Sequence, residues 1–138
     1  MTIKQLSIFI ENKGGTLIKV LNLLSNAGIQ IIASTVADTQ DYGIYRVLCQ
    51  QPAQAYIILK EAGINVQLAD VMALSIDDTP GCAAKAVKTL SDAGISILYM
   101  YSFLWKGKGV LVMRTDNAEK TKETIMLKKL AFLTEADF

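Results

Sequence analysis

The segment Ser25-Asn26-Ala27-Gly28-Ile29 returns 66 positions further along the chain as Ser91-Asp92-Ala93-Gly94-Ile95. This pattern predicts a helix that ends on a glycine and leads into a strand, because glycine readily adopts the left-handed conformation that terminates helices. The same offset aligns Asn12-Lys13-Gly14-Gly15 with Asp78-Thr79-Pro80-Gly81, a turn that precedes a helix. The chain therefore contains one structural unit repeated twice.

The similarity extends well beyond these two segments. Between residues 10–43 and 76–109, ten of the 34 aligned pairs are identical, where unrelated sequences would share about two. The identical pairs are Ile10/Ile76, Gly15/Gly81, Lys19/Lys85, Leu24/Leu90, Ser25/Ser91, Ala27/Ala93, Gly28/Gly94, Ile29/Ile95, Ile31/Ile97 and Gly43/Gly109. We expect two domains, at residues 1–69 and 70–138.

Each unit has the hydrophobic pattern of four strands and two helices. In both units an apolar stripe at helical spacing, such as Leu17, Val20, Leu21 and Leu24, follows an alternating strand. Further strands are expected at residues 29–37, 43–49, 66–69, 95–104, 109–115 and 131–135. The second helices are expected at 52–63 and after Asp116, the latter with Glu119 in a capping box. This order predicts an α+β fold of two tandem ferredoxin-like βαββαβ units, with antiparallel sheets and helices packed on one face.

Composition excludes several kinds of chemistry. The 138 residues include 14 Lys+Arg, 13 Asp+Glu and no His, so the formal charge is +1. Without His there is no Ser-His-Asp or Cys-His nucleophile and no His-ligated metal site, and no metal or cofactor is expected. Cys49 and Cys82 form no C-x-x-C motif and are interpreted as buried thiols of a reducing cytosol. The chain lacks the apolar run of a signal peptide or membrane span, so a cytoplasmic location is expected.

Aromatic residues alternate in the second expected strand of the second unit, at Tyr99, Tyr101, Phe103 and Trp105. We call these four residues the aromatic ladder. They share one face of the strand, and they form an interaction patch if that face is open or part of the core if helices cover it.

The following turn and strand superficially resemble an RNA-recognition signature, Lys106-Gly107-Lys108-Gly109-Val110-Leu111-Val112-Met113. The positions that stack on bases are occupied by Lys108, Val110 and Met113, which are not aromatic. Together with the near-zero net charge, this argues against nucleic acid as a partner.

The turn before the first helix of each unit is the most informative candidate binding site. A helix start offers unpaired N–H groups and a positive dipole end, which suit a small carboxylate. Gly15 and Gly81 permit close approach, while Asn12 and Asp78 either cap the helix or meet an ammonium group.

At these residues the sequence resembles the ACT-domain family in its stand-alone tandem form. The resemblance covers nearly the whole chain and rests on the two turns that precede helices and on the two Ala-Gly-Ile entries to strands. It implies a regulatory amino-acid sensor, not an enzyme, that binds a free amino acid at the interface between two units. Because the chain carries no enzyme or DNA-binding domain, the resemblance implies that its output is a partner protein, from biosynthesis or regulation, or its own homodimer.

The resemblance also implies which residues contact the ligand, at the turn of one unit and the start of the second strand of another. By position these are Asn12, Lys13, Gly14, Gly15, Thr16, Ile29, Gln30 and Ile31 in the first unit, and Asp78, Thr79, Pro80, Gly81, Cys82, Ile95, Ser96 and Ile97 in the second. Gly14 stands where the family usually has Pro, which leaves open whether one site or both are used. The nearby isoleucines favour an apolar, aromatic or other neutral side chain on the ligand.

Two other classes of function remain open at this stage. A small enzyme would need a perturbed carboxylate, and the acidic pairs Asp77-Asp78 and Asp38/Asp41 are interpreted as solvated loop residues. A structural subunit would instead homodimerise through its sheet face without a ligand.

Overall fold

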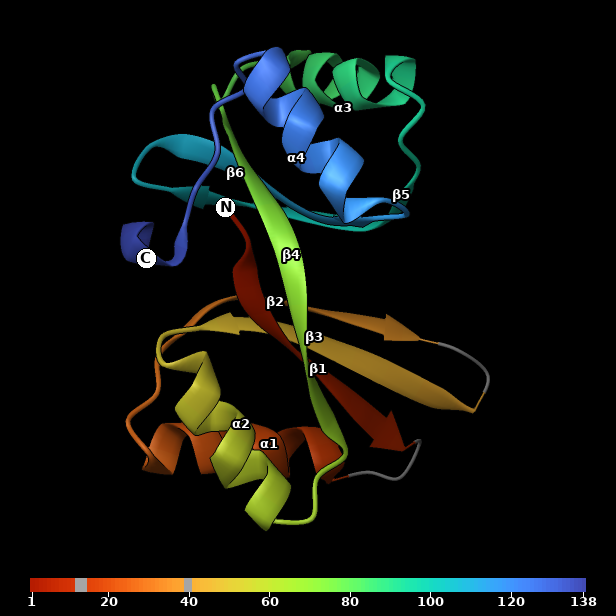
Figure 1. Ribbon diagram of the computed structural model, residues 1–138. Coiled ribbons are helices and arrows are strands. Elements are labelled where there is room, and N and C mark those ends of the chain that lie inside the picture. Colours follow the sequence, from red (N-terminus) through yellow and green to blue (C-terminus); the bar gives the residue numbers. More distant parts are fainter. Residues whose placement is uncertain (12–14, 39–40) are drawn as a thin grey trace. The chain divides into compact units, whose positions relative to one another are not determined.

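The structure is a computed structural model that describes residues 1–11, 15–38 and 41–138 (Figure 1). In chain order its elements are β1 (Ile3–Glu11), α1 (Thr16–Asn26), β2 (Ile31–Asp38), β3 (Tyr42–Cys49), α2 (Pro52–Glu61), β4 (Val66–Ile76), α3 (Cys82–Asp92), β5 (Ile97–Trp105), β6 (Lys108–Thr115), α4 (Ala118–Leu127) and the short 3-10 helix Glu135–Asp137. Contacts divide the chain into an N-terminal unit, Lys4–Ala69 with Phe138, and a C-terminal unit, Met1–Ile3 with Asp70–Asp137. The predicted α+β class and the two ferredoxin-like units are confirmed.

In the N-terminal unit the strand order is β2-β3-β1-β4. Alternation along β1 places Leu6 and Ile8 in the core, where they pair with Val47 and Tyr45 of antiparallel β3. Helices α1 and α2 cover this face of the sheet (Figure 1). Val20 and Leu24 of the predicted α1 stripe are fully buried in the same core and Leu21 packs against it, whereas Leu17 is exposed.

The C-terminal unit repeats this plan with the order β4-β6-β5. Met72 and Leu74 of β4 pair with Met113 and Leu111 of β6, and these side chains form the core beneath α3 and α4. The predicted last strand, 131–135, is wrong in extent: only a single bridge joins Phe132 to Leu74. The chain turns away at once because the 3-10 helix Glu135–Asp137 follows.

The start of α4 also differs from the prediction. Asn117 is the N-cap, and its side-chain oxygen accepts a hydrogen bond of 3.0 Å from the backbone N–H of Lys120. Glu119 forms no capping box, since its carboxylate pairs with Lys122 at 3.3 Å. Because Asn117, one residue after Asp116, occupies the N-cap position, Glu119 is free to form the salt bridge.

The register of β5 decides where the aromatic ladder points. A bulge between Ile97 and Tyr99 shifts the pairing by one residue, so that Tyr101 lies opposite Val112 and Phe103 opposite Val110. Because opposite residues share a face, the ladder lies on the face of the sheet turned away from α3 and α4. The rings are half-buried, and the indole N–H of Trp105 donates to the carbonyl of Asp137 at 3.1 Å.

Candidate ligand-binding site

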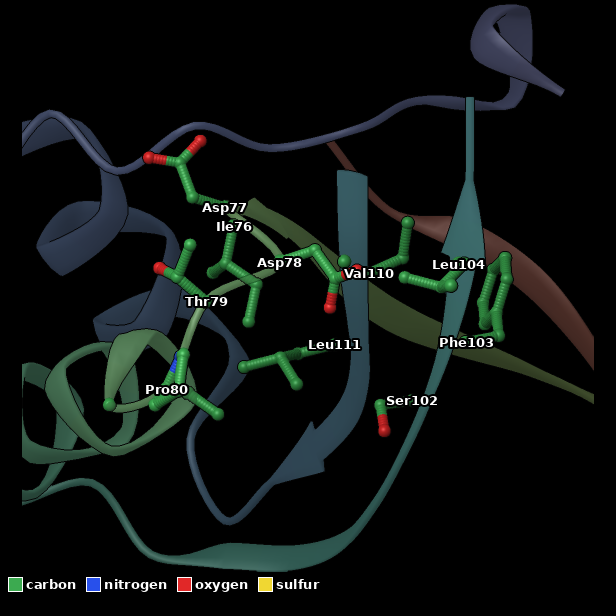
Figure 2. A pocket seen from close by; sticks show the side chains of 13 residues that line it. Ile76, Asp77, Asp78, Thr79, Pro80, Ser102, Phe103, Leu104, Val110 and Leu111 are labelled. Atoms are coloured by element: carbon green, nitrogen blue, oxygen red, sulfur yellow. The ribbon is translucent and has the colours of Figure 1, made fainter. Parts of the chain in front are cut away.

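A pocket of about 410 Å³ opens beside the start of α3 in the C-terminal unit (Figure 2). We call it the α3 pocket. The β4–α3 turn, the beginning of α3 and strands β5 and β6 line it. Its residues are Ile76, Asp77, Asp78, Thr79, Pro80, Gly81, Ala83, Ser102, Phe103, Leu104, Gly109, Val110 and Leu111. Four of the predicted ligand contacts, Asp78 to Gly81, are therefore part of one cavity.

The turn at the head of this pocket leaves Asp78 without a structural partner. Gly81 is the N-cap of α3, with φ of 90°, and no side chain caps the helix. The interpretation of Asp78 as an N-cap is therefore wrong. Its carboxylate lines the pocket and forms no hydrogen bond or ion pair within residues 1–11, 15–38 and 41–138.

The neighbouring acid, Asp77, forms an ion pair with Lys108. Lys108 Nζ lies 2.6 Å from Asp77 Oδ1, and this hydrogen bond and the opposite charge lower the pKa of Asp77 and raise the pKa of Lys108. The first turn of α3 carries no acidic residue, so no side-chain charge offsets the positive end of the helix dipole. The N–H groups at this end therefore still favour a negatively charged group. The α3 pocket therefore offers an unpaired carboxylate beside a place that favours a negative group.

Apolar side chains make the remaining wall. Ile76, Leu111 and Leu104 line the cavity, and Ser102 adds a hydroxyl from β5 (Figure 2). Sequence reasoning missed Ser102 and Leu104. They lie opposite Leu111 and Gly109 in the register that the β5 bulge sets, and periodicity alone does not reveal that bulge.

The predicted contacts at the start of β5 do not lie in this pocket. Ile95 is buried in the core, and the backbone N–H of Ser96 donates to Asp116 Oδ1 at 3.0 Å. These residues follow the far end of α3, about 16 Å from its start for a helix of this length. Cys82 also lies outside the lining, and its Sγ is 2.9 Å from Thr79 Oγ1.

In the N-terminal unit, too, the predicted contacts at the turn before the helix and those at the start of the second strand lie in different places. Asn12, Lys13 and Gly14 lie outside the described residues, and Gly15 is the N-cap of α1 with φ of 107°. Thr16 lines a pocket of about 450 Å³ at the start of α1. Residues 29–31 line a different pocket, of about 430 Å³, at the end of α1.

Both cysteines carry free thiols. Cys49 is buried, as expected, and burial raises its pKa from 9.0 to about 11. The expectation of full burial is wrong for Cys82, which is half-buried at the first position of α3. Among the described residues, no group of three His, Cys, Asp or Glu side chains could hold a metal ion. No helix in the described part of the chain is long and apolar enough to cross a membrane.

Comparison with known proteins identifies the protein family. A family model described as an ACT domain pair matches residues 1–138, and the chain belongs to this family. The predicted ACT family is thereby confirmed, and ACT domain pairs are regulatory modules.

Solved structures share the fold of this chain. A protein from Bacteroides thetaiotaomicron is 38% identical with a TM-score of 0.93, over 99% of this chain and 95% of that chain. The regulatory subunit of aspartate kinase from Thermus thermophilus shares the fold at 14% identity and a TM-score of 0.62, over 90% of each chain. Its counterpart from Thermus flavus does so at 19% identity and a TM-score of 0.59, over 90% of each chain. No functionally curated protein sequence matched the chain.

Proposed function

We propose that this ACT domain pair is a cytoplasmic amino-acid sensor that binds a free amino acid with a neutral, apolar side chain in the α3 pocket. The observation that carries the proposal is the unpaired carboxylate of Asp78 beside a helix start without an acidic cap. An amino acid has the complementary pair of charges.

Each part of the ligand has a counterpart in the pocket. The α-carboxylate meets the N–H groups of the first turn of α3, and the α-ammonium meets Asp78. The side chain lies against Ile76, Leu104 and Leu111, which favours an apolar group. The Asp77–Lys108 pair satisfies both of its own charges, so it gives no support to a charged ligand side chain.

The proposal includes a homodimer formed along β5. This edge strand has nine residues, Ile97–Trp105, and none of them is charged. Soluble proteins protect an exposed edge with charges or proline, so an unprotected edge favours pairing with another strand. Leu104, which is 64% exposed and lines the α3 pocket, would then be covered, and occupancy of the pocket would bias assembly or a partner protein.

An enzyme on the same residues has less support. A general acid would need a carboxyl whose pKa is raised, whereas Lys108 lowers the pKa of Asp77.

Calorimetry with the twenty amino acids tests the proposal on the full chain. We expect at least one neutral amino acid to bind, and Asp78→Asn to weaken that binding about tenfold or more through loss of the charge-assisted contact. Asp92→Asn is the matched control, because Asp92 pairs with Lys88 at the other end of α3. A wild-type protein that binds none of the twenty contradicts the proposal.

A further inference from the structure

The end of α4 exposes two apolar residues that are followed directly by two basic ones. Met126 is 61% exposed and Leu127 is 78% exposed, and the next residues, Lys128 and Lys129, are exposed as well. We call these four residues the α4-end patch. Single apolar side chains are common on protein surfaces, whereas adjoining apolar residues beside charged ones are typical of places where a partner binds.

The internal repeat argues against a purely structural role for the patch. Helices α2 and α4 have ten residues each and lie 66 positions apart in the sequence. Their buried positions correspond, since both Leu59 and its equivalent Ile125 are fully buried. The residues equivalent to the α4-end patch are Lys60, Glu61, Ala62 and Gly63. The same helix in the same fold therefore ends without an apolar pair and without two adjacent bases.

Lys129 has a backbone conformation that suits glycine better than lysine. Its φ is 55°, and the equivalent Gly63 has φ of 79°. The left-handed residue ends the helix, because it allows the N–H of Leu130 to donate to the carbonyl of Ile125 at 3.0 Å. Lysine is less favourable than glycine there, since its Cβ lies too close to a carbonyl oxygen. A lysine kept at a cost in stability indicates that its side chain has a task that glycine cannot fulfil.

The charges of the patch suit an acidic partner. Within the described part of the chain, neither Lys128 nor Lys129 forms an ion pair or a side-chain hydrogen bond. Glu123, which is also exposed, lies one helical turn before Leu127. The negative charge is therefore on the helix side of the apolar pair and the positive charge at the helix end. This polarity favours a bound segment whose carboxylates lie at the lysines.

The chain that follows the patch leads to the candidate ligand site. The carbonyl of Ala131 accepts a hydrogen bond of 2.9 Å from the N–H of Ser75 on β4. The next residue of β4, Ile76, lines the α3 pocket, and Leu130 packs against the core of the same unit. A protein bound at the end of α4 would therefore lie close to the α3 pocket.

We propose that the α4-end patch is a docking surface for an acidic segment of another protein. Carboxylates of that segment bind Lys128 and Lys129, and its apolar side chains cover Met126 and Leu127. The inference goes beyond the proposed function, because it does not require that an amino acid binds in the α3 pocket.

Selection of short random peptides on the immobilised full chain tests the docking surface without a known partner. We expect the selected peptides to combine aspartate or glutamate with leucine or phenylalanine. Fluorescence anisotropy then measures the affinity of the best peptide. Leu127→Ser should weaken it about tenfold, and Lys129→Gly about threefold, since an exposed charge contributes less than a covered apolar side chain. The affinity should also fall as the salt concentration rises.

Two controls separate binding from folding. Glycine suits the left-handed backbone at position 129, so Lys129→Gly should unfold at a temperature no lower than the wild type while it binds the peptide more weakly. Ile57→Ser removes an exposed apolar side chain from α2 in the other unit, and it should leave the peptide affinity unchanged.

Several results would overturn the proposal. It fails if no acidic peptide is selected, or if Leu127→Ser and Lys129→Gly bind the best peptide as tightly as the wild type. Binding to phosphatidylserine vesicles that Leu127→Ser abolishes would assign the patch to a membrane surface instead. Loss of self-association in the same variant would assign it to a second copy of the chain. Amino-acid binding is tested independently, because neither Leu127 nor Lys129 lines the α3 pocket.

Discussion

Asp77 and Asp78 are adjacent in the sequence but have different roles. Lys108 holds Asp77 at 2.6 Å, whereas Asp78 lines the α3 pocket with its carboxylate unpaired within the described residues. The sequence predicted a functional turn here, but it could not separate the two acids. Their difference depends on the pairing of β4 with β6, which brings Lys108 beside Asp77.

Gly81 is required by its backbone conformation. Its φ is 90°, and a Cβ added there would meet no atom within 4 Å, so a substitution is opposed by conformation and not by a clash. We expect Gly81→Ala to lower the free energy of unfolding by about 1 kcal/mol, measured by chemical denaturation. Gly81→Asn should lose clearly less, since Asn tolerates the left-handed region. Equal losses for both variants would contradict this explanation.

Cys49 makes stability depend on pH in the alkaline range. Burial raises its pKa to about 11 in the folded state, so the unfolded chain releases the thiol proton first, near 9.0. The contribution is fully present below pH 9 and is lost as the pH rises toward 11. We expect the unfolding free energy of the wild type to fall on the order of 1 kcal/mol more than that of Cys49→Ala over this range. Parallel curves for the two proteins would refute the prediction.

At the scale of elements, β5 shows what periodicity could and could not predict. Alternation correctly placed the aromatic ladder on one face of the strand. The bulge between Ile97 and Tyr99 then decided which face that was, and it brought Ser102 and Leu104 to the α3 pocket. A bulge is an irregularity of pairing between two strands, so a single strand's pattern does not contain it.

The cap of α4 gives a test at the same scale. Asn117→Ala removes the acceptor of the Lys120 N–H, and we expect a loss of about 1 kcal/mol in unfolding free energy. Glu119→Ala is the control. Its salt bridge to Lys122 is exposed, so the loss should be no more than a few tenths of a kcal/mol. The capping-box prediction would regain support if the Glu119 variant lost as much as the Asn117 variant.

At the scale of the whole molecule, the repeat explains why the fold was largely predictable and the full lining of the pockets was not. Paired positions such as Gly15/Gly81 and Leu24/Leu90 have the same structural tasks in both units, so each unit supports the assignment of the other. The units differ at the partner of the acid that ends the first strand: Lys108 pairs with Asp77, whereas Tyr42 lies opposite Glu11. The effect of these differences depends on the strand register, because the register decides which residues lie opposite one another.

Assembly through β5 is testable on the full chain. Met100 is on this edge strand and 43% exposed, and a lysine there would place a charge on the proposed interface. We expect Met100→Lys to shift the sedimentation coefficient from dimer to monomer, while Ile57→Lys, which is 54% exposed on α2, leaves the dimer intact. A wild-type monomer, or a Met100→Lys protein that remains dimeric, would contradict the proposed interface.

The most direct measurement of the central claim is a crystal structure of the full chain with the amino acid that binds most tightly. The account predicts density in the α3 pocket, with the carboxylate at the N–H groups of the first turn of α3, the ammonium at Asp78, and the side chain against Ile76 and Leu111. Density for the ligand elsewhere, with the α3 pocket holding only solvent, would contradict it.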